Sequence, residues 1–287
     1  MTDYISGEKL QELTDLTIIF DDQRHPDLWQ AQIPNTTCAY VVLKVGEQLP
    51  LEVYQARSIF VYTHALDMFF QRVFPLLKSP FILMSHNSDW GINDAQYDAY
   101  LNDPKLIRWF AQNVNYKHEK LIPIPIGIAN SQWEHGDFDV IEDVIKEDNS
   151  LTRPVYNNFN PTTSPENRYH VARALHLNNI PIDQPTYNKD FLRKLSKSVC
   201  CICPYGAGID SHRVWEAQYL GSIPVVPRCV TFESFDLPFI HIDNWDDVTY
   251  DYLYKSVEVI KQKEYSRDQL TITYWRDVIN SYMDIHV

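Results

Sequence analysis

A short stretch of the chain combines residue types that bind anions. Two glycines, Gly206 and Gly208, follow an apolar run, and the basic residues His212 and Arg213 then open a pattern typical of a helix. Cations are unfavourable in the first turn of a helix by ~0.3–1 kcal/mol, whereas a bound anion reverses the sign of that effect. Helix N-termini that follow glycine loops are anion sites. The stretch therefore predicts a binding site for a phosphate group.

An acidic residue, Glu216, comes four residues after His212 and so lies on the same face of the predicted helix. A carboxylate one turn from a phosphate site can bind ribose hydroxyls, as an acidic residue does in dinucleotide-binding folds. Together these residues indicate a site for a nucleoside diphosphate. The alternative is that Arg213 pairs with Asp210 or Glu216 and that the glycines only form a turn. The loop matches neither the P-loop nor the dinucleotide fingerprint, so the motif alone leaves both readings open.

The elements that position this loop are predicted on either side of it. An apolar strand is expected over residues 199–203, and a second buried strand over residues 223–226. Asp210 or Ser211 is a suitable N-cap for the helix between them. Gly221 is expected to end that helix. The loop should therefore lie at the carboxyl end of a strand, where α/β sheets bind ligands.

The segment 203–217 reads Cys-Pro-x-Gly-x-Gly-x-Asp-x-His-Arg-x-Trp-Glu-Ala, and residues 220–226 read Leu-Gly-Ser-Ile-Pro-Val-Val. Both resemble the C-terminal half of exostosin-like glycosyltransferases, most of all the small stand-alone versions, some of them known from large algal viruses. Residues 109–113 and 124–136 look like companion motifs, so the resemblance covers about residues 80–245. It implies an α/β fold with two Rossmann-like domains facing a cleft (GT-B type). It also implies a UDP-sugar donor and inversion at the anomeric carbon without an essential metal.

The glycine loop and the helix start are expected to bind the donor. The leaving nucleotide gains negative charge, which N–H dipoles and cations can stabilise without a metal. We predict no metal ligands and no cofactor apart from the UDP-sugar, with UDP-xylose as the guess from the family's range. The predicted donor-binding residues are Tyr205, Gly206, Ala207, Gly208, Asp210, Ser211, His212, Arg213, Glu216 and Arg228.

Length and patterning predict two domains. The chain has 287 residues, enough for two medium-sized domains, and strands alternate with helices in both halves. We predict an acceptor-binding domain over 1–148, joined by a C-terminal helix over 266–287, and a nucleotide-sugar-binding domain over 149–265. Within the first domain, residues 94–112 are predicted to be helical.

Polar residues follow a buried strand that begins near residue 80, and they are candidates for the acceptor side of the site. Inverting transfer needs a base within hydrogen-bond reach of the acceptor hydroxyl. We favour Asp89 for this role, then His86, then Glu134 or His135. Aromatic residues can stack on sugar rings, although they are more often part of a core. The predicted acceptor-binding residues are His64, Trp90, Trp133, Glu134 and His135.

Composition narrows the class of protein. The net charge of −13 argues against nucleic acid or an anionic membrane as a partner. The partners that the resemblance implies are a nucleotide sugar and a glycan acceptor. No apolar run is long enough to span a membrane, and the N-terminus lacks the features of a signal peptide. Cys200 and Cys203 have Cys-x-x-Cys spacing, but no second pair completes a zinc site, so the five cysteines are expected to be buried thiols. We therefore predict a cytoplasmic protein, in the host cytoplasm if the chain is viral.

Two other functions are compatible with the sequence. A glycoside hydrolase could use two of the carboxylates, but it would not need a cationic helix start after a glycine loop. A nucleotide- or glycan-binding protein without catalysis would keep every feature described above. Binding of a donor analogue without turnover would favour the second of these.

Overall fold

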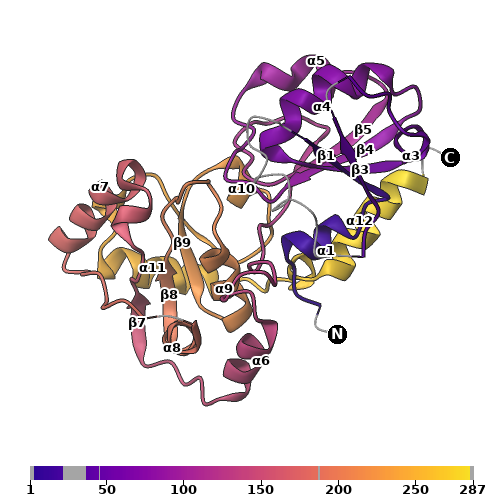
Figure 1. The fold of residues 1–287 in the computed structure, drawn as a ribbon. Helices are drawn as coiled ribbons and strands as arrows, with labels where there is room; N and C mark the ends of the chain where they lie inside the picture. The colour runs from indigo at the N-terminus through magenta and orange to yellow at the C-terminus, as the bar shows by residue number, and fades with distance from the viewer. Residues whose placement is uncertain (1–2, 22–36, 45, 187, 285–287) are drawn as a thin grey trace. The chain divides into compact units, whose positions relative to one another are not determined.

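The computed structural model describes residues 3–21, 37–44, 46–186 and 188–284, which form two compact units. The first contains residues 5–126 and 272–284, and the second contains residues 3–4 and 127–271. Each unit is a parallel β-sheet accompanied by helices (Figure 1). The prediction of an α/β fold is therefore confirmed. We call the two parts the six-stranded unit and the four-stranded unit.

The six-stranded unit has the strand order β2-β1-β3-β4-β5-β6, and every neighbouring pair is parallel. From β1 the chain passes to β2 on one side of β1 and then to β3 on its other side, so β1 and β3 flank a topological switch point. All carboxyl ends of the strands lie at one edge. The strands are β1 Leu16–Phe20, β2 Tyr40–Leu43, β3 Ser58–Tyr62, β4 Phe81–His86, β5 Leu106–Ala111 and β6 Leu121–Pro123.

The helical prediction for residues 94–112 is wrong in its second half. Only η3 (Ala95–Tyr97) and α5 (Asp98–Leu101) are helical, while β5 pairs with β4 and β6. A short, almost continuously apolar run fits a buried helix and a buried parallel strand equally well, and pairing within the sheet decides between them. The other helices of this unit are α1 Gly7–Gln11, α3 Leu51–Gln55, η1 Thr63–Ala65, α4 Leu66–Arg72, η2 Phe74–Leu76 and α12 Ile272–Asp284.

The four-stranded unit has the order β10-β9-β8-β7, again with parallel pairs throughout. Its strands are β7 Arg153–Tyr156, β8 Ser198–Ile202, β9 Ile223–Pro227 and β10 Ile240–Ile242. Its helices are α6 Phe138–Lys146, η4 Pro161–Thr163, α7 Pro165–Leu177, α8 Asn188–Ser196, α9 His212–Leu220, α10 Val230–Glu233, η5 Trp245–Asp247, α11 Tyr250–Ile260 and η6 Asp268–Leu270.

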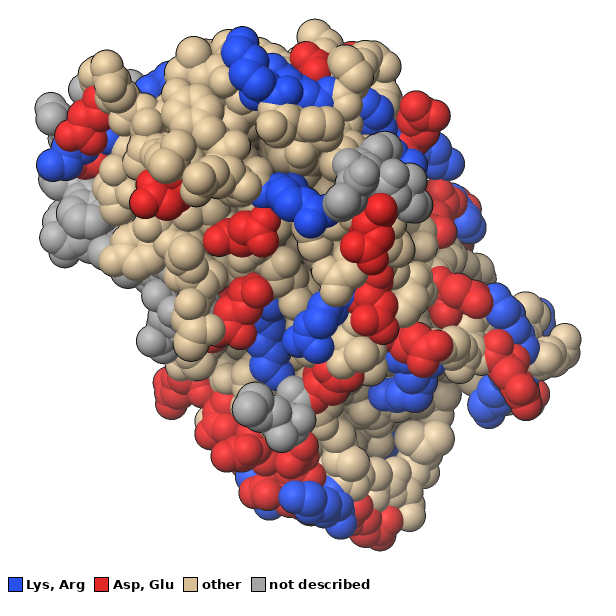
Figure 2. Space-filling model, turned by 90° about the vertical axis from the view of Figure 1, so that its right-hand side faces the viewer, with Lys and Arg blue, Asp and Glu red and all other residues tan. Residues whose placement is uncertain are grey.

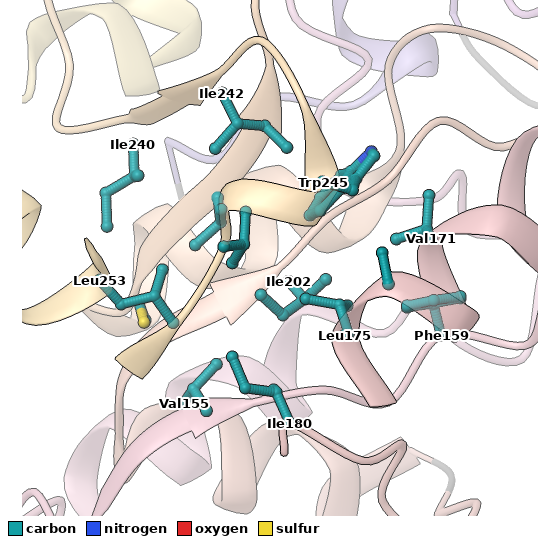
Figure 3. Close-up of a cluster of buried hydrophobic side chains, with 14 of the residues drawn as sticks. Val155, Phe159, Val171, Leu175, Ile180, Ile202, Ile240, Ile242, Trp245 and Leu253 are labelled. Carbon is teal, nitrogen blue, oxygen red and sulfur yellow. The ribbon is translucent and has the colours of Figure 1, made fainter. Parts of the chain in front are cut away.

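A hydrophobic core joins the strands of this unit to α7 and α11. Figure 3 shows Ile202 of β8 among side chains such as Val171 and Leu175 of α7 and Leu253 of α11. Burying each aliphatic side chain of this size stabilises the fold by roughly 1.5–3 kcal/mol. These core contacts fix the carboxyl end of β8 and the body of α7. The glycine loop follows β8, and α7 carries a residue of the candidate site.

Candidate functional site

The glycine loop leaves the carboxyl end of β8 and enters α9, as the sequence predicted. Ser211 is the N-cap residue, but its side chain makes no capping hydrogen bond. Gly221 ends the helix in the left-handed conformation, with φ of 80°, which confirms the predicted stop. Because no side chain caps the first turn, its N–H groups can be paired by a ligand.

Asp210 fixes the loop to the helix. Its buried carboxylate accepts hydrogen bonds from the indole N–H of Trp215 at 2.8 and 2.9 Å and from the backbone N–H of Ser211 at 2.8 Å. These hydrogen bonds fix the end of the loop relative to α9. We infer that Asp210 shapes the glycine loop through them.

A basic residue that sequence reasoning missed, Arg168 of α7, supports the same loop. Its side chain is only 9% exposed, and its Nε donates to the carbonyl oxygen of Tyr205 at 2.8 Å. A Cβ atom on residue 206 would lie 3.1 Å from Nη2 of Arg168, so Gly206 leaves room for the guanidinium. Burial, and next the positive charge of Arg213, lower the pKa of Arg168 to about 10. Arg168 lies near the start of a helix, but no glycine loop precedes it, so the signal that marked Arg213 in the sequence is absent there.

Arg168 and Arg213 bring two positive charges together, and the charge of Arg213 also acts on Glu216 at more than ion-pair distance. The Arg213 guanidinium carbon lies 5.5 Å from the ring centre of Phe191, and its buried Nη1 has no hydrogen-bond partner. Among the described residues, no carboxylate forms an ion pair with either guanidinium. Buried donors are normally paired, so Nη1 of Arg213 is open to an external acceptor. In the alternative reading Arg213 pairs with Asp210 or Glu216; neither carboxylate forms an ion pair with it, although the charge of Arg213 acts on Glu216.

Glu216, one turn further along α9, is a buried carboxylate that the described residues leave without hydrogen-bond donors. The residue is 7% exposed, and within the described chain its carboxylate accepts no hydrogen bond. Burial raises its pKa to about 7, while the charge of Arg213 acts in the opposite direction. A buried carboxylate without donors is costly for the protein alone. Among the described residues, the site therefore lacks a hydrogen-bond acceptor for Nη1 of Arg213 and hydrogen-bond donors for Glu216.

Other residues predicted to bind the donor are engaged within the protein. Burial and a hydrogen bond between the Tyr205 hydroxyl and Cys229 raise the pKa of Tyr205. Arg228 forms ion pairs with Asp243 at 2.8 Å and Glu233 at 3.4 Å, so its charge is already balanced. The tip of the loop, formed by Ala207 and Gly208, is the part that is more open to solvent.

Three residues predicted to bind the acceptor belong to the four-stranded unit, together with the donor loop. Trp133, Glu134 and His135 are exposed in the segment that precedes α6. The ring of His135 lies 6.0 Å from the ring of His212 between centroids. The structure thus brings His135 beside the start of α9, a proximity that the sequence did not predict.

The two predicted catalytic residues follow β4 in the six-stranded unit and differ in their surroundings. His86 is buried, with Nδ1 3.0 Å from Oδ1 of Asn87 and Nε2 3.0 Å from the carbonyl oxygen of Pro125. Burial lowers the pKa of His86. Asp89, by contrast, is exposed at the carboxyl edge of the sheet. Both ring nitrogens of His86 are therefore engaged, while Asp89 is accessible to solvent.

Trp90 and His64 lie at this same edge of the six-stranded sheet. Trp90 is exposed directly after Asp89, and His64 follows β3, the neighbour of β4. Burial lowers the pKa of His64. The carboxyl edge of the sheet thus carries an acid, an aromatic ring and a neutral imidazole.

The surface carries charged side chains of both signs. On the face shown in Figure 2, basic side chains are interspersed with acidic ones. Within the described ranges, no His, Cys, Asp and Glu side chains group in threes as metal ligands would. Among the same residues, every helix is too short or too polar to cross a membrane. An anion would therefore be bound by the two arginines at the glycine loop.

Fold and site together define a class of protein. A glycine loop that joins a parallel strand to a helix, with one buried and one half-buried arginine beside it, is typical of α/β proteins that bind anionic ligands at the carboxyl edge of the sheet.

Comparison with known proteins shows what part of the chain is similar to. Residues 148–285, just under half of the chain, match a family model described as the RXYLT1 C-terminal domain. A probable glycosyltransferase of Arabidopsis thaliana is 34% identical over 73 residues, which are 25% of this chain and 15% of the relative. The chain thus spans a small part of that relative's length. Both matches support the resemblance to exostosin-like glycosyltransferases that the sequence motifs indicated.

Proposed function

We propose that the chain is an inverting glycosyltransferase that takes its sugar from a UDP-sugar bound at the glycine loop and the start of α9. The observation that carries this proposal is the pair Arg168 and Arg213, two neighbouring guanidinium groups that form no ion pair with a carboxylate among the described residues, with the buried Nη1 of Arg213 unpaired. A diphosphate supplies the missing negative charge. It also accepts from the uncapped N–H groups of the helix.

Glu216 gives the nucleotide its orientation. Its buried carboxylate lacks hydrogen-bond donors, and a ribose offers two neighbouring hydroxyl groups. With the ribose at Glu216 and the phosphates at Arg213, the sugar-bearing end of the donor points toward His212. One ligand then supplies both the acceptor for the arginines and the hydroxyl donors for Glu216.

The arginines also serve the chemical step. When the bond between sugar and diphosphate breaks, negative charge grows on the leaving phosphate oxygen. Fixed positive groups in a partly buried site stabilise that charge more in the transition state than in the bound donor. Two guanidinium groups can fill the role that a divalent metal has in other transferases, so we propose a metal-independent reaction.

We further propose a GT-B-type division of roles, in which the six-stranded unit binds the acceptor. Its carboxyl edge carries polar residues after neighbouring parallel strands, as ligand-binding edges do. Asp89 is our choice for the base, because it is exposed whereas both ring nitrogens of His86 are engaged. In this role Asp89 accepts the proton of the attacking hydroxyl as the new glycosidic bond forms and UDP departs.

UDP-xylose is the proposed donor, since the matched family model takes its name from a xylosyltransferase. Calorimetric titration with a panel of nucleotide sugars tests the proposal, followed by an assay for UDP release with glycan acceptors. We expect UDP and at least one UDP-sugar to bind the wild type, and binding to be lost in Arg213→Ala. Absence of any nucleotide or nucleotide-sugar binding to the folded protein would refute the function.

The compartment is part of the same proposal. All five cysteines are free thiols, and Cys200, Cys201, Cys203 and Cys229 are buried. Free thiols persist where the environment is reducing. We therefore propose a cytoplasmic enzyme.

A further inference from the structure

An exposed tryptophan is held rigidly in the segment before α6. The backbone N–H of Trp133 donates to the carbonyl of Asn130 at 3.0 Å, and the N–H of Gly136 donates to the carbonyl of Trp133 at 2.8 Å. A Cβ atom on Gly136 would lie 2.1 Å from the carbonyl oxygen of Asn130, so only glycine allows these two consecutive turns. The turns fix the backbone, yet 55% of Trp133 remains exposed. An aromatic side chain this open is not there to fill a core.

Ring contacts connect this indole to the helix that begins the candidate site. Trp133 stacks on His135, with centroids 6.4 Å apart and planes inclined by 23°. His135 meets His212, the first residue of α9, at 6.0 Å and 61°. Nδ1 of His212 lies 2.8 Å from the carbonyl oxygen of Gly127 and must donate to it, because a carbonyl only accepts. The indole therefore has a defined position relative to the start of α9.

We propose that Trp133, supported by His135, binds the ring of the sugar carried by the donor. This inference rests on the proposed function, because it uses the placement of the nucleotide. Ribose at Glu216 and phosphates at Arg213 direct the next group of the ligand toward His212, and the row of aromatic rings begins there. In a nucleotide sugar, the group that follows the second phosphate is the sugar to be transferred.

The chemistry of the segment selects a neutral pyranose. One face of a pyranose carries C–H groups that pack on the flat, electron-rich face of an indole, while its hydroxyls point sideways toward water and polar side chains. Residues 131–135 include Glu134 and contain no lysine or arginine. A sugar with its own carboxylate would meet the negative charge of Glu134 there. The segment therefore favours an uncharged sugar over a uronic acid.

Separate titrations with UDP and with a UDP-sugar test this role. In Trp133→Ala we expect the Kd of UDP-xylose or UDP-glucose to rise about tenfold, as for the loss of ~50 Å² of apolar contact. The Kd of UDP should stay within a factor of two, since UDP carries no sugar. Trp133→Phe should recover most of the loss because it keeps an aromatic face. Tyr254→Ala, which removes an aromatic residue that is 68% exposed on α11, is the matched control and should change neither constant.

The outcomes separate this inference from the function on which it rests. If the wild type binds UDP and UDP-sugars but Trp133→Ala binds both as the wild type does, the sugar role of Trp133 is refuted and the donor site stands. Equal weakening of UDP and UDP-sugar would place the indole at the nucleotide and would also refute the inference. A raised KM for the glycan acceptor with an unchanged Kd for the UDP-sugar would assign Trp133 to the acceptor and overturn it. Failure of the wild type to bind any of these ligands would overturn the function and the inference together.

Discussion

Glu216→Gln is the most informative single substitution, because it should stabilise the free protein while it weakens donor binding. Burial raises the pKa of Glu216 from its usual 4.5 to about 7. Between these values the folded protein holds a proton that the unfolded chain has released, so stability falls as pH rises from about 4.5 to about 7. Each pKa unit corresponds to ~1.4 kcal/mol, so the ionised carboxylate costs the folded state about 3 kcal/mol above pH 7. The cost is absent below pH 4.5.

Glutamine has the size of glutamate but carries no charge. At pH 8 we expect Glu216→Gln to raise the free energy of unfolding by at most ~3 kcal/mol, since the buried amide also lacks partners. At pH 4.5 the two proteins should have nearly the same stability. Urea denaturation of ligand-free protein at several pH values measures both quantities. Glu258→Gln, at a largely solvated position on α11, is the matched control and should show no such dependence on pH.

Binding of a nucleotide sugar should change in the opposite direction. Ribose hydroxyls that donate to Glu216 favour its ionised form, so the wild type should bind a UDP-sugar more tightly as pH rises through about 7. Glu216→Gln should lose this dependence and bind about tenfold more weakly at pH 8. Calorimetry in two buffers of different ionisation enthalpy would detect the proton released on binding by the wild type.

Two results would refute this reasoning. If Glu216→Gln is destabilised equally at pH 4.5 and pH 8, the carboxylate is already compensated in the free protein. If the variant is stabilised at pH 8 but binds the UDP-sugar as the wild type does, the ligand donates no hydrogen bonds to Glu216.

The remaining predictions concern the cations, the base and metal dependence. Arg213→Ala and Arg168→Lys should each weaken UDP binding by roughly 10–100-fold, the range for a lost charge-assisted hydrogen bond, whereas Lys255→Ala on α11 should not; unchanged titrations in both arginine variants would exclude the phosphate site. Asp89→Asn should keep the Kd of the donor while kcat falls at least a hundredfold, and normal turnover would exclude Asp89 as the base. EDTA should leave most of the activity in a UDP-release assay, and loss of activity that returns with a divalent metal would contradict the metal-independent reaction.

Local sequence was sufficient for the parts of the site that are close together along the chain. The glycine loop, the start of α9 and its end at Gly221 are set by turn and capping preferences of a few consecutive residues. The alternation of strands and helices likewise predicted the α/β class, because each element has its own apolar pattern. The burial of Cys200, Cys201 and Cys203 followed from the apolar run that contains them.

Tertiary structure decided what depends on contacts between distant segments. β5 is a strand because β4 and β6 offer it hydrogen-bond partners on both sides, although its own sequence also fits a helix. Arg168 meets the carbonyl of Tyr205, 37 positions later, because β7 and β8 are neighbours and bring α7 beside the loop. His86 is engaged at both ring nitrogens only because Pro125 lies across the edge of the sheet. Residue types indicate the chemistry of a site. Which of its charges remain unpaired depends on strand pairing, because pairing decides which distant residues come into contact.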